Sequence, residues 1–452
     1  MDEKNQLGWL LGLAVLILGL GGCQNQRREG KLDRATLESF AALPQHAQSG
    51  NPELQAELKR IRKERATPDL LVAPDDVALL ETSRRPTRAS RIRYTRALLE
   101  LLPPMHRKRF IGQMEREFPR ACLPPRRADL AAFQERAREW QKMRSEAEAI
   151  LVQPDFGLHV PVDHGLLADL SHVDLVRALA RLECLHAAIA IMEGDVPRAL
   201  VAWETGGRWL EALASLPHAV PRAAAARGRI EWLRCAQSLL STPGVSPESA
   251  RTVAAVLDRQ LRQWPPDRRA LLGDRAVGLH TYELLRAGYW MSLLTRRELE
   301  ELRQQGRLKP FAIHIATQLD EDELYYLKTM RRIIDESEQP YPQREKTLDA
   351  IDAELRRLSG STSYPWFAAE YLLPDVRHLV RWQALDRELT EALRWTIAAA
   401  LGEPQAKIHS PMTGKEWHWE RREQPERVEL PDVLWPLDDT PVTLPVLGMR
   451  QR

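Results

Sequence analysis

Residues 174–192, which read DLVRALARLECLHAAIAIM, decide the fold. Their large apolar residues recur every three or four positions, which places them on one face of an α-helix. Gly194 then ends the predicted helix, and Asp195 with Pro197 begins the next one. We therefore expect two antiparallel helices joined by a short turn.

The same pattern continues towards residue 264 and predicts two more helices. An apolar stripe follows Asp195 as far as Pro217 and Pro221. A third helix carries Ile230, Leu233 and Leu240, and a fourth is predicted to start at Ser246–Pro247. Gly206–Gly207 lies inside the second stripe, where close helix packing accounts for it better than phosphate binding does. The four helices predict a bundle or an irregular array of helical hairpins.

Composition agrees with a helix-rich body. The chain has 452 residues, of which 44% are hydrophobic and 28% charged, and its net charge is +2. Length alone favours two or three domains. We predict an all-α fold with a small β-containing C-terminal tail. The expected segments are a signal peptide or membrane anchor (1–22), a tether (23–50), a basic helical region (51–150), a helical-hairpin bundle (151–310), a second helical unit (311–402) and a Pro/Trp-rich tail with short strands (403–452).

The N-terminus predicts a membrane attachment. Residues 7–22 carry no charge, and at sixteen residues they suit a signal peptide better than a bilayer span, which needs about 20. Leu20-Gly21-Gly22-Cys23 resembles the lipobox of bacterial lipoproteins, which implies lipid attachment at Cys23. The acidic start, Asp2–Glu3, and the basic residues after the apolar run instead favour an uncleaved anchor with a cytoplasmic C-terminus. Both alternatives remain open.

The other cysteines, Cys122, Cys184 and Cys235, show no spacing typical of a zinc site. Cys184 and Cys235 fall within helical patterns, so we expect small buried apolar residues, with a disulfide bridge as the alternative. We expect no cofactor.

The most basic stretch runs from Arg84 to Arg109 and contains a single acid, Glu100. Close to a membrane anchor, such a stretch suits anionic lipid headgroups, although a solvated helix face has the same composition. Aromatic residues do not alternate with the arginines, so we expect no nucleic-acid partner.

One loop offers the residue types of a metal site. Residues 155–172 contain three histidines and three aspartates: Asp155, His159, Asp163, His164, Asp169 and His172. Imidazole and carboxylate groups bind divalent metals, which leaves a metal-dependent hydrolase as an alternative function. No established metal-binding spacing is present, and Asp and His are also common in loops. Farther along, Asp320, Glu321, Asp322 and Glu323 are interpreted as acids favoured by a helix N-terminus.

Four segments together resemble a known group of proteins. They are the Gly194–Asp195 turn, the stretch from Asp320 to Met330, Leu372-Leu373-Pro374, and SPMTGKEWHW at 410–419. The set resembles large, uncharacterised helical secreted proteins of planctomycete-type bacteria over roughly residues 150–430. In their tails an Asp usually stands where this chain has Ser410, and a Pro where it has Glu416. The resemblance implies a secreted helical body and no particular activity.

The motif at 410–419 predicts a turn, with Pro411 at its entry and Gly414 within it. It is also similar to the C-terminal turn of type II secretion pseudopilins. An accessory role in a secretion or pilus-like system is therefore another alternative.

We find no serine-hydrolase or nucleotide-binding motif in the sequence. The sequence as a whole favours a non-catalytic, membrane-anchored lipoprotein of the cell envelope. Its helical body would face the periplasm and bind protein partners.

Overall fold

The computed structural model describes residues 49–65, 87–122, 127–242, 245–403 and 410–415, together with strands at 427–434 and 441–445. Cys23 and the predicted anchor lie outside the described residues. The folded body is all-α, as predicted. Its helices are α3 (Pro52–Arg65), α4 (Arg88–Glu100), α5 (Pro104–Cys122), η3 (Arg127–Asp129), α6 (Leu130–Glu139), α7 (Gln141–Leu151), η4 (Val162–Leu167), α8 (Ser171–Met192), α9 (Val196–Ala214), α10 (Ala219–Leu240), α11 (Pro247–Arg262), α12 (Asp267–Arg286), α13 (Trp290–Leu293), α14 (Arg296–Gln304), α15 (Leu308–Thr317), α16 (Leu319–Asp335), α17 (Tyr341–Leu358), η5 (Ala368–Leu372) and α18 (Leu373–Ala400).

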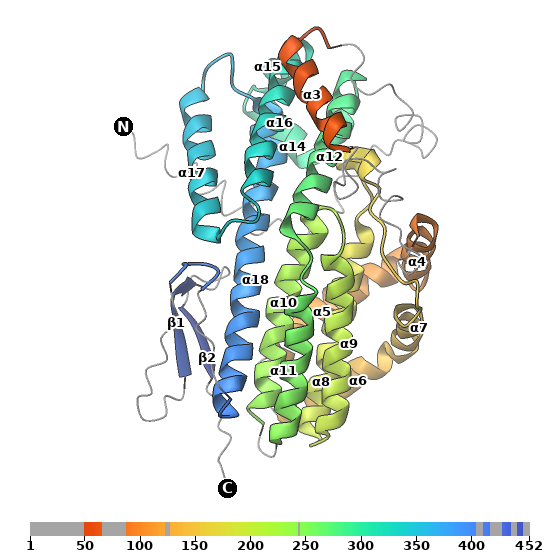
Figure 1. Ribbon diagram of the computed structural model, residues 1–452. Helices are drawn as coiled ribbons and strands as arrows, with labels where there is room; N and C mark the ends of the chain where they lie inside the picture. The colour runs from red at the N-terminus through yellow and green to blue at the C-terminus, as the bar shows by residue number, and fades with distance from the viewer. Residues whose placement is uncertain are drawn as a thin grey trace.

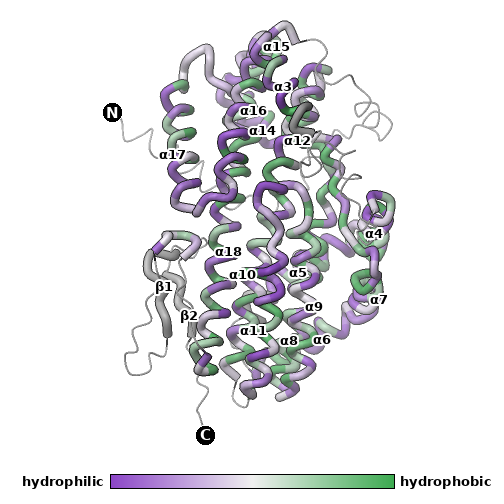
Figure 2. Tube along the Cα trace, viewed as in Figure 1, coloured by the Kyte–Doolittle hydropathy of each residue, from purple (hydrophilic) through white to green (hydrophobic). Residues whose placement is uncertain are grey.

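Helices α8, α9, α10, α11 and the second half of α18 lie side by side as a bundle (Figure 1). Helices α5 and α6 pack on α8 and cover one side of it. Apolar and polar residues are mixed along these helices (Figure 2), and α8 is buried around its whole circumference rather than on one face. The bundle confirms the helical-hairpin arrangement predicted from residues 174–264.

The α8–α9 turn forms where the sequence predicted it. Gly194 has a φ of 79°, and the amide of Asp195 donates to the carbonyl of Ala190 at 2.8 Å. The carboxylate of Asp195 in turn accepts the amide of Arg198 at 3.1 Å, which caps the first turn of α9. A left-handed glycine and an aspartate cap therefore reverse the chain within two residues.

Two tryptophans join α9 to α10. The rings of Trp203 and Trp232 stack with centroids 4.2 Å apart and planes 4° from parallel. Each indole N–H donates to the other residue's carbonyl, at 3.1 and 2.6 Å. A Cβ on Gly207 would stand 2.8 Å from the ring of Trp232, so only glycine allows this approach. The packing role predicted for Gly206–Gly207 is confirmed.

The described helices enclose two hydrophobic cores. The first core lies among α4 to α11 and includes Leu179, Trp203 and Leu239. The second lies among α3, α12 and α14 to α17, with Tyr282 and Tyr326 fully buried. Helix α18 contributes to both, because its first half packs in the second core and its last half in the first.

One carboxylate ties the second core together. Asp322, in the first turn of α16, accepts the hydroxyl of Tyr282 at 2.5 Å and bonds to His314 Nε2 at 2.7 Å. It also accepts the amides of Phe367 and Ala368, at 2.8 and 2.9 Å. Its side chain is fully buried. Asp322 thus links α12, α15 and η5 to α16.

Residues 128–152 do not form one continuous helix, because the structure divides them between α6 and α7. Trp140, with φ −106° and ψ 6°, separates α6 from α7. Its indole N–H donates to Gln113 at 2.9 Å, and its ring lies 5.0 Å from that of Phe110. These contacts with α5 outweigh the local helical preference.

The predicted turn at residues 410–415 is confirmed. Gly414 has a φ of 70°, and its amide donates to the carbonyl of Ser410 at 2.8 Å. The Ser410 hydroxyl donates to the buried carboxylate of Glu388 on α18 at 2.7 Å. The turn is thereby anchored to the body.

Strands β1 (Arg427–Leu434) and β2 (Pro441–Pro445) run antiparallel, with Val428 opposite Leu444. The residues that precede and join them lie outside the described residues, Trp417–Trp419 among them. A folded β-containing tail is therefore not supported and stays a prediction.

Cys184 and Cys235 are both buried and unbridged, as the first interpretation predicted. The Cys235 thiol donates weakly to the carbonyl of Cys184 at 3.9 Å. The side chain of Cys122 lies outside the described residues. None of the described helices is long and apolar enough to cross a membrane.

Candidate functional site

Two carboxylates of the predicted metal loop form hydrogen bonds and ion pairs with α4. Asp155 accepts the hydroxyl of Tyr94 in a short hydrogen bond and pairs with Arg93 at 3.0 Å. Asp163 pairs with Arg88 at 3.4 Å. These two aspartates therefore face cations and a phenol on α4.

Two histidines of the loop are neutral at pH 7, His159 half-buried and His172 buried. The pKa of His159 is lowered to about 4, first by burial and then by the charge of Arg88. Burial likewise lowers the pKa of His172 to about 4, and this side chain is only 1% exposed. Across the described ranges, no three His, Cys, Asp or Glu side chains are arranged to hold a metal ion. The six predicted ligands do not converge.

Several arginines of the predicted basic stretch hold the body together. Arg107 donates to the carbonyls of Leu99 and Leu102, at 2.5 and 3.3 Å. Arg109 pairs with Glu139 at 2.6 Å. Arg84 and Arg85 lie outside the described residues. Contact of this stretch with lipid stays a prediction.

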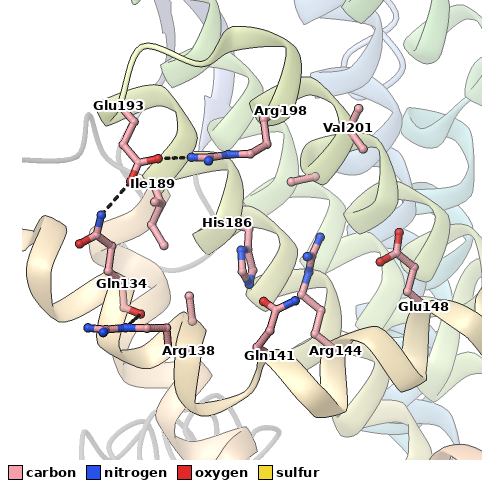
Figure 3. Close-up of a pocket in the computed structure, with 12 residues that line it drawn as sticks. Gln134, Arg138, Gln141, Arg144, Glu148, His186, Ile189, Glu193, Arg198 and Val201 are labelled. Atoms are coloured by element: carbon pink, nitrogen blue, oxygen red, sulfur yellow. Dashed lines mark hydrogen bonds and ion pairs between the residues drawn. The ribbon is translucent and has the colours of Figure 1, made fainter.

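An open groove of about 730 Å³ lies where α6 and α7 face α8 and the start of α9 (Figure 3). We call it the α6–α9 groove. Its lining is Gln134, Ala137, Arg138, Gln141, Arg144, Glu148, His186, Ile189, Glu193, Arg198, Val201 and Ala202.

One end of the groove is closed by a chain of polar contacts. Glu193, which follows α8, forms a short ion pair with Arg198 of α9. The same carboxylate accepts a hydrogen bond from the side-chain amide (Nε2) of Gln134 on α6 at 2.7 Å. Figure 3 shows Glu193 between its two partners, linked to Arg198 on one side and to Gln134 on the other. They fix the spacing of α6 from the α8–α9 turn.

Arg144 and His186 lie together in the middle of the groove (Figure 3). The guanidinium of Arg144 binds both carboxylate oxygens of Glu183, at 2.7 and 2.6 Å, and Glu183 is buried in α8. Burial, together with Arg144 and Arg198, lowers the pKa of His186 to about 4. His186 is therefore neutral at pH 7, and the positive charge of the groove comes from its arginines.

Arg138 and Val201 give the groove a cation and an apolar contact that both face solvent. Arg138 is exposed, and within the described ranges it makes a single hydrogen bond, to the carbonyl of Gln134 at 3.3 Å. Val201 is 63% exposed and gives the groove an apolar contact that faces solvent. A ligand segment with an acidic and an apolar side chain matches both.

A second groove, of about 580 Å³, brings the two predicted segments together. Arg91 comes from the basic stretch, and Phe156, Gly157 and Leu158 come from the loop. Its other lining residues are Leu151, Arg208, Glu211, Ala212, Ser215, Leu216, Pro217, Arg259 and Arg269. Arg208 and Arg259 share Glu204, at 3.6 and 3.1 Å, so part of the charge of this groove is neutralised.

The residues of the α6–α9 groove were not singled out from the sequence. The available signal was in α8, where Glu183 and His186 interrupt an otherwise apolar run three residues apart. Their partner Arg144 lies 39 residues from Glu183, so the pair could not be identified without the fold.

Comparisons with known proteins do not assign a function to this groove. No protein-family model matches the chain, and neither a curated protein nor a solved structure is significantly similar to it.

Proposed function

We propose that this chain is a non-catalytic lipoprotein of the cell envelope whose helical body binds a partner protein in the α6–α9 groove. The body would be anchored through Cys23 and would face the periplasm. The groove carries the proposal, because it is open and lined by arginines beside an exposed apolar side chain. The lipobox-like sequence at 20–23 supports the anchor.

The lining of the groove favours an amphipathic segment with acidic residues. Three arginines line it against two glutamates, and Glu193 is already paired with Arg198. A carboxylate on the partner would bind Arg138 in a charge-assisted hydrogen bond. An apolar side chain elsewhere on the same segment would cover Val201 and Ile189.

Site-specific photocrosslinking tests the groove directly. We expect a photoreactive residue at Val201 to give one major adduct in cells, and Arg138→Glu in the same chain to abolish it. The matched control is a photoreactive residue at Val152, which is 59% exposed and lies outside the groove lining. Equal labelling from positions 201 and 152 would contradict the proposal, as would an adduct unaffected by Arg138→Glu.

The anchor is tested separately, by mass spectrometry and fractionation of the full chain in a host that lipidates proteins. We expect a lipid-sized mass increase at Cys23 that Cys23→Ala removes. An unmodified chain that retains Met1 would contradict lipid attachment and would favour the uncleaved anchor.

A further inference from the structure

A smaller cavity lies apart from the grooves, between α8, α10 and the first half of α18. Its volume is about 50 Å³. The lining is Val173, Asp174, Arg177, Ala219, Val220, Ala223, Ala224, Arg227, His378 and Trp382. One water needs about 10–15 Å³ by this measure, so the cavity has room for a small polyatomic ion.

Among the residues that the structure describes, the buried cation Arg177 has no bonded partner. It is 6% exposed, and within the described part of the chain its guanidinium makes no hydrogen bond and no ion pair within 4 Å; its Nε is fully buried. Arg181, one turn along α8, differs in this respect, because it binds both oxygens of Glu231 at 3.0 and 2.8 Å. Leaving a buried charged donor without an acceptor is costly, so the site favours an additional acceptor.

Arg227 enters the same cavity from α10. Its guanidinium lies 5.3 Å from the centre of the Trp382 ring, and it forms no ion pair with any described carboxylate within 4 Å. Two guanidinium groups from different helices therefore line one small space. Their planar donors match the oxygens of a carboxylate or phosphate.

The described carboxylates around the cavity do not supply the hydrogen-bond acceptor that Arg177 lacks. Asp174 shares the cavity, Glu231 is bound to Arg181, and Glu115 lies 3.8 Å from Arg181. Burial, followed by the charge of Arg181, lowers the pKa of Arg177 to about 10. Burial raises the pKa of the Asp174 carboxyl.

We propose that this cavity binds a small oxoanion, either a carboxylate or a phosphate group, between Arg177 and Arg227. Trp382 and His378 would form the wall on the α18 side. The site is independent of the groove proposed above, because the two linings share no residue.

Thermal unfolding of the full-length protein in detergent tests the site, with sodium phosphate and sodium acetate as probes. Each is compared with sodium chloride at equal ionic strength, which separates binding from screening. We expect Tm to rise with the logarithm of phosphate or acetate concentration, as for a ligand that binds only the folded state. A rise with phosphate alone or acetate alone would identify which oxoanion fits.

Two variants make the outcome specific. We expect Arg177→Met to be at least as stable as the wild-type protein in chloride, and to lose the anion-dependent rise, with affinity weakened by at least roughly tenfold. Arg181→Met, which breaks an existing ion pair, should lower Tm in chloride yet keep most of the rise. The proposal is overturned if neither anion raises Tm beyond chloride, or if Arg177→Met responds as the wild-type protein does.

Discussion

At the scale of single residues, the first turn of α16 distinguishes two uses of an acidic side chain. Glu321 is exposed, so its charge acts mainly on the helix dipole. Asp322, its neighbour, is fully buried and receives four hydrogen bonds from three other elements. The sequence predicted only the dipole effect for both, because the partners of Asp322 lie 8–46 residues away.

Asp322→Asn should therefore destabilise the protein far more than Glu321→Gln. The asparagine loses charge-assisted bonds and turns amide donors towards the backbone N–H groups of Phe367 and Ala368. We expect a loss of about 3 kcal/mol in the free energy of unfolding. For Glu321→Gln we expect less than about 1 kcal/mol. Urea unfolding measures both, and equal losses would mean that only the dipole matters.

His172 gives a prediction for pH dependence. Burial lowers its pKa to about 4, and this effect outweighs the opposing charge of Asp169 and a hydrogen bond to the Asp169 backbone. As pH falls below about 6.5 the unfolded chain takes up a proton that the folded chain accepts only near pH 4. The folded state therefore loses stability between pH 6.5 and 4.

His172→Leu should remove this loss. We expect stability at pH 7 to be unchanged or higher, and the decline between pH 7 and 4 to be smaller by ~3 kcal/mol. Chemical denaturation at several pH values provides the measurement. His106→Gln removes an exposed histidine and serves as the control. A variant that follows the wild-type pH curve would contradict the assignment.

At the scale of helices, glycine positions set how closely neighbours approach. A Cβ at Gly207 would meet the Trp232 ring at 2.8 Å and Gln260 Nε2 at 3.1 Å. A Cβ at Gly112 on α5 would lie 3.7 Å from its nearest neighbour, the Arg116 guanidinium, which is an ordinary contact distance. We expect Gly207→Ala to cost about 1–3 kcal/mol through overpacking, although alanine favours helix formation.

Gly112→Ala should instead stabilise by up to about 1 kcal/mol, because only the helix preference changes there. Thermal unfolding of the pair, with near-UV circular dichroism to follow the tryptophan stack, provides the measurement. A stabilising Gly207→Ala would mean that α9 and α10 can separate without loss.

Helix boundaries could be predicted where the signal is local. Gly194, Asp195 and Ser246 cap their helices through contacts within five residues. Trp140 could not be predicted to break a helix, because its partner Gln113 lies on another helix, 27 residues away.

The candidate sites are harder to predict than the helix boundaries, because their residues come from segments that are far apart in the sequence. Arg177 appears in the sequence as one polar position in an apolar helix, and only the fold places Arg227 and Trp382 beside it.

At the scale of the whole molecule, α18 is shared by two cores. Leu379 is fully buried in the second core and Leu389 is 2% exposed in the first. The buried pair of Arg229 and Asp386, at 2.9 Å, fixes α18 to α10. Neither core is complete without this helix. The two cores should therefore unfold together, although length alone favours several domains.

Differential scanning calorimetry of the wild-type protein, Leu379→Ala and Leu389→Ala tests this coupling. Each substitution opens a cavity in one core and should cost about 2–5 kcal/mol. We expect one transition in all three proteins, shifted down as a whole by either substitution, with calorimetric and van't Hoff enthalpies in agreement. Two transitions, each moved by only one substitution, would show that the cores unfold separately. In that case α18 would link two units that fold on their own.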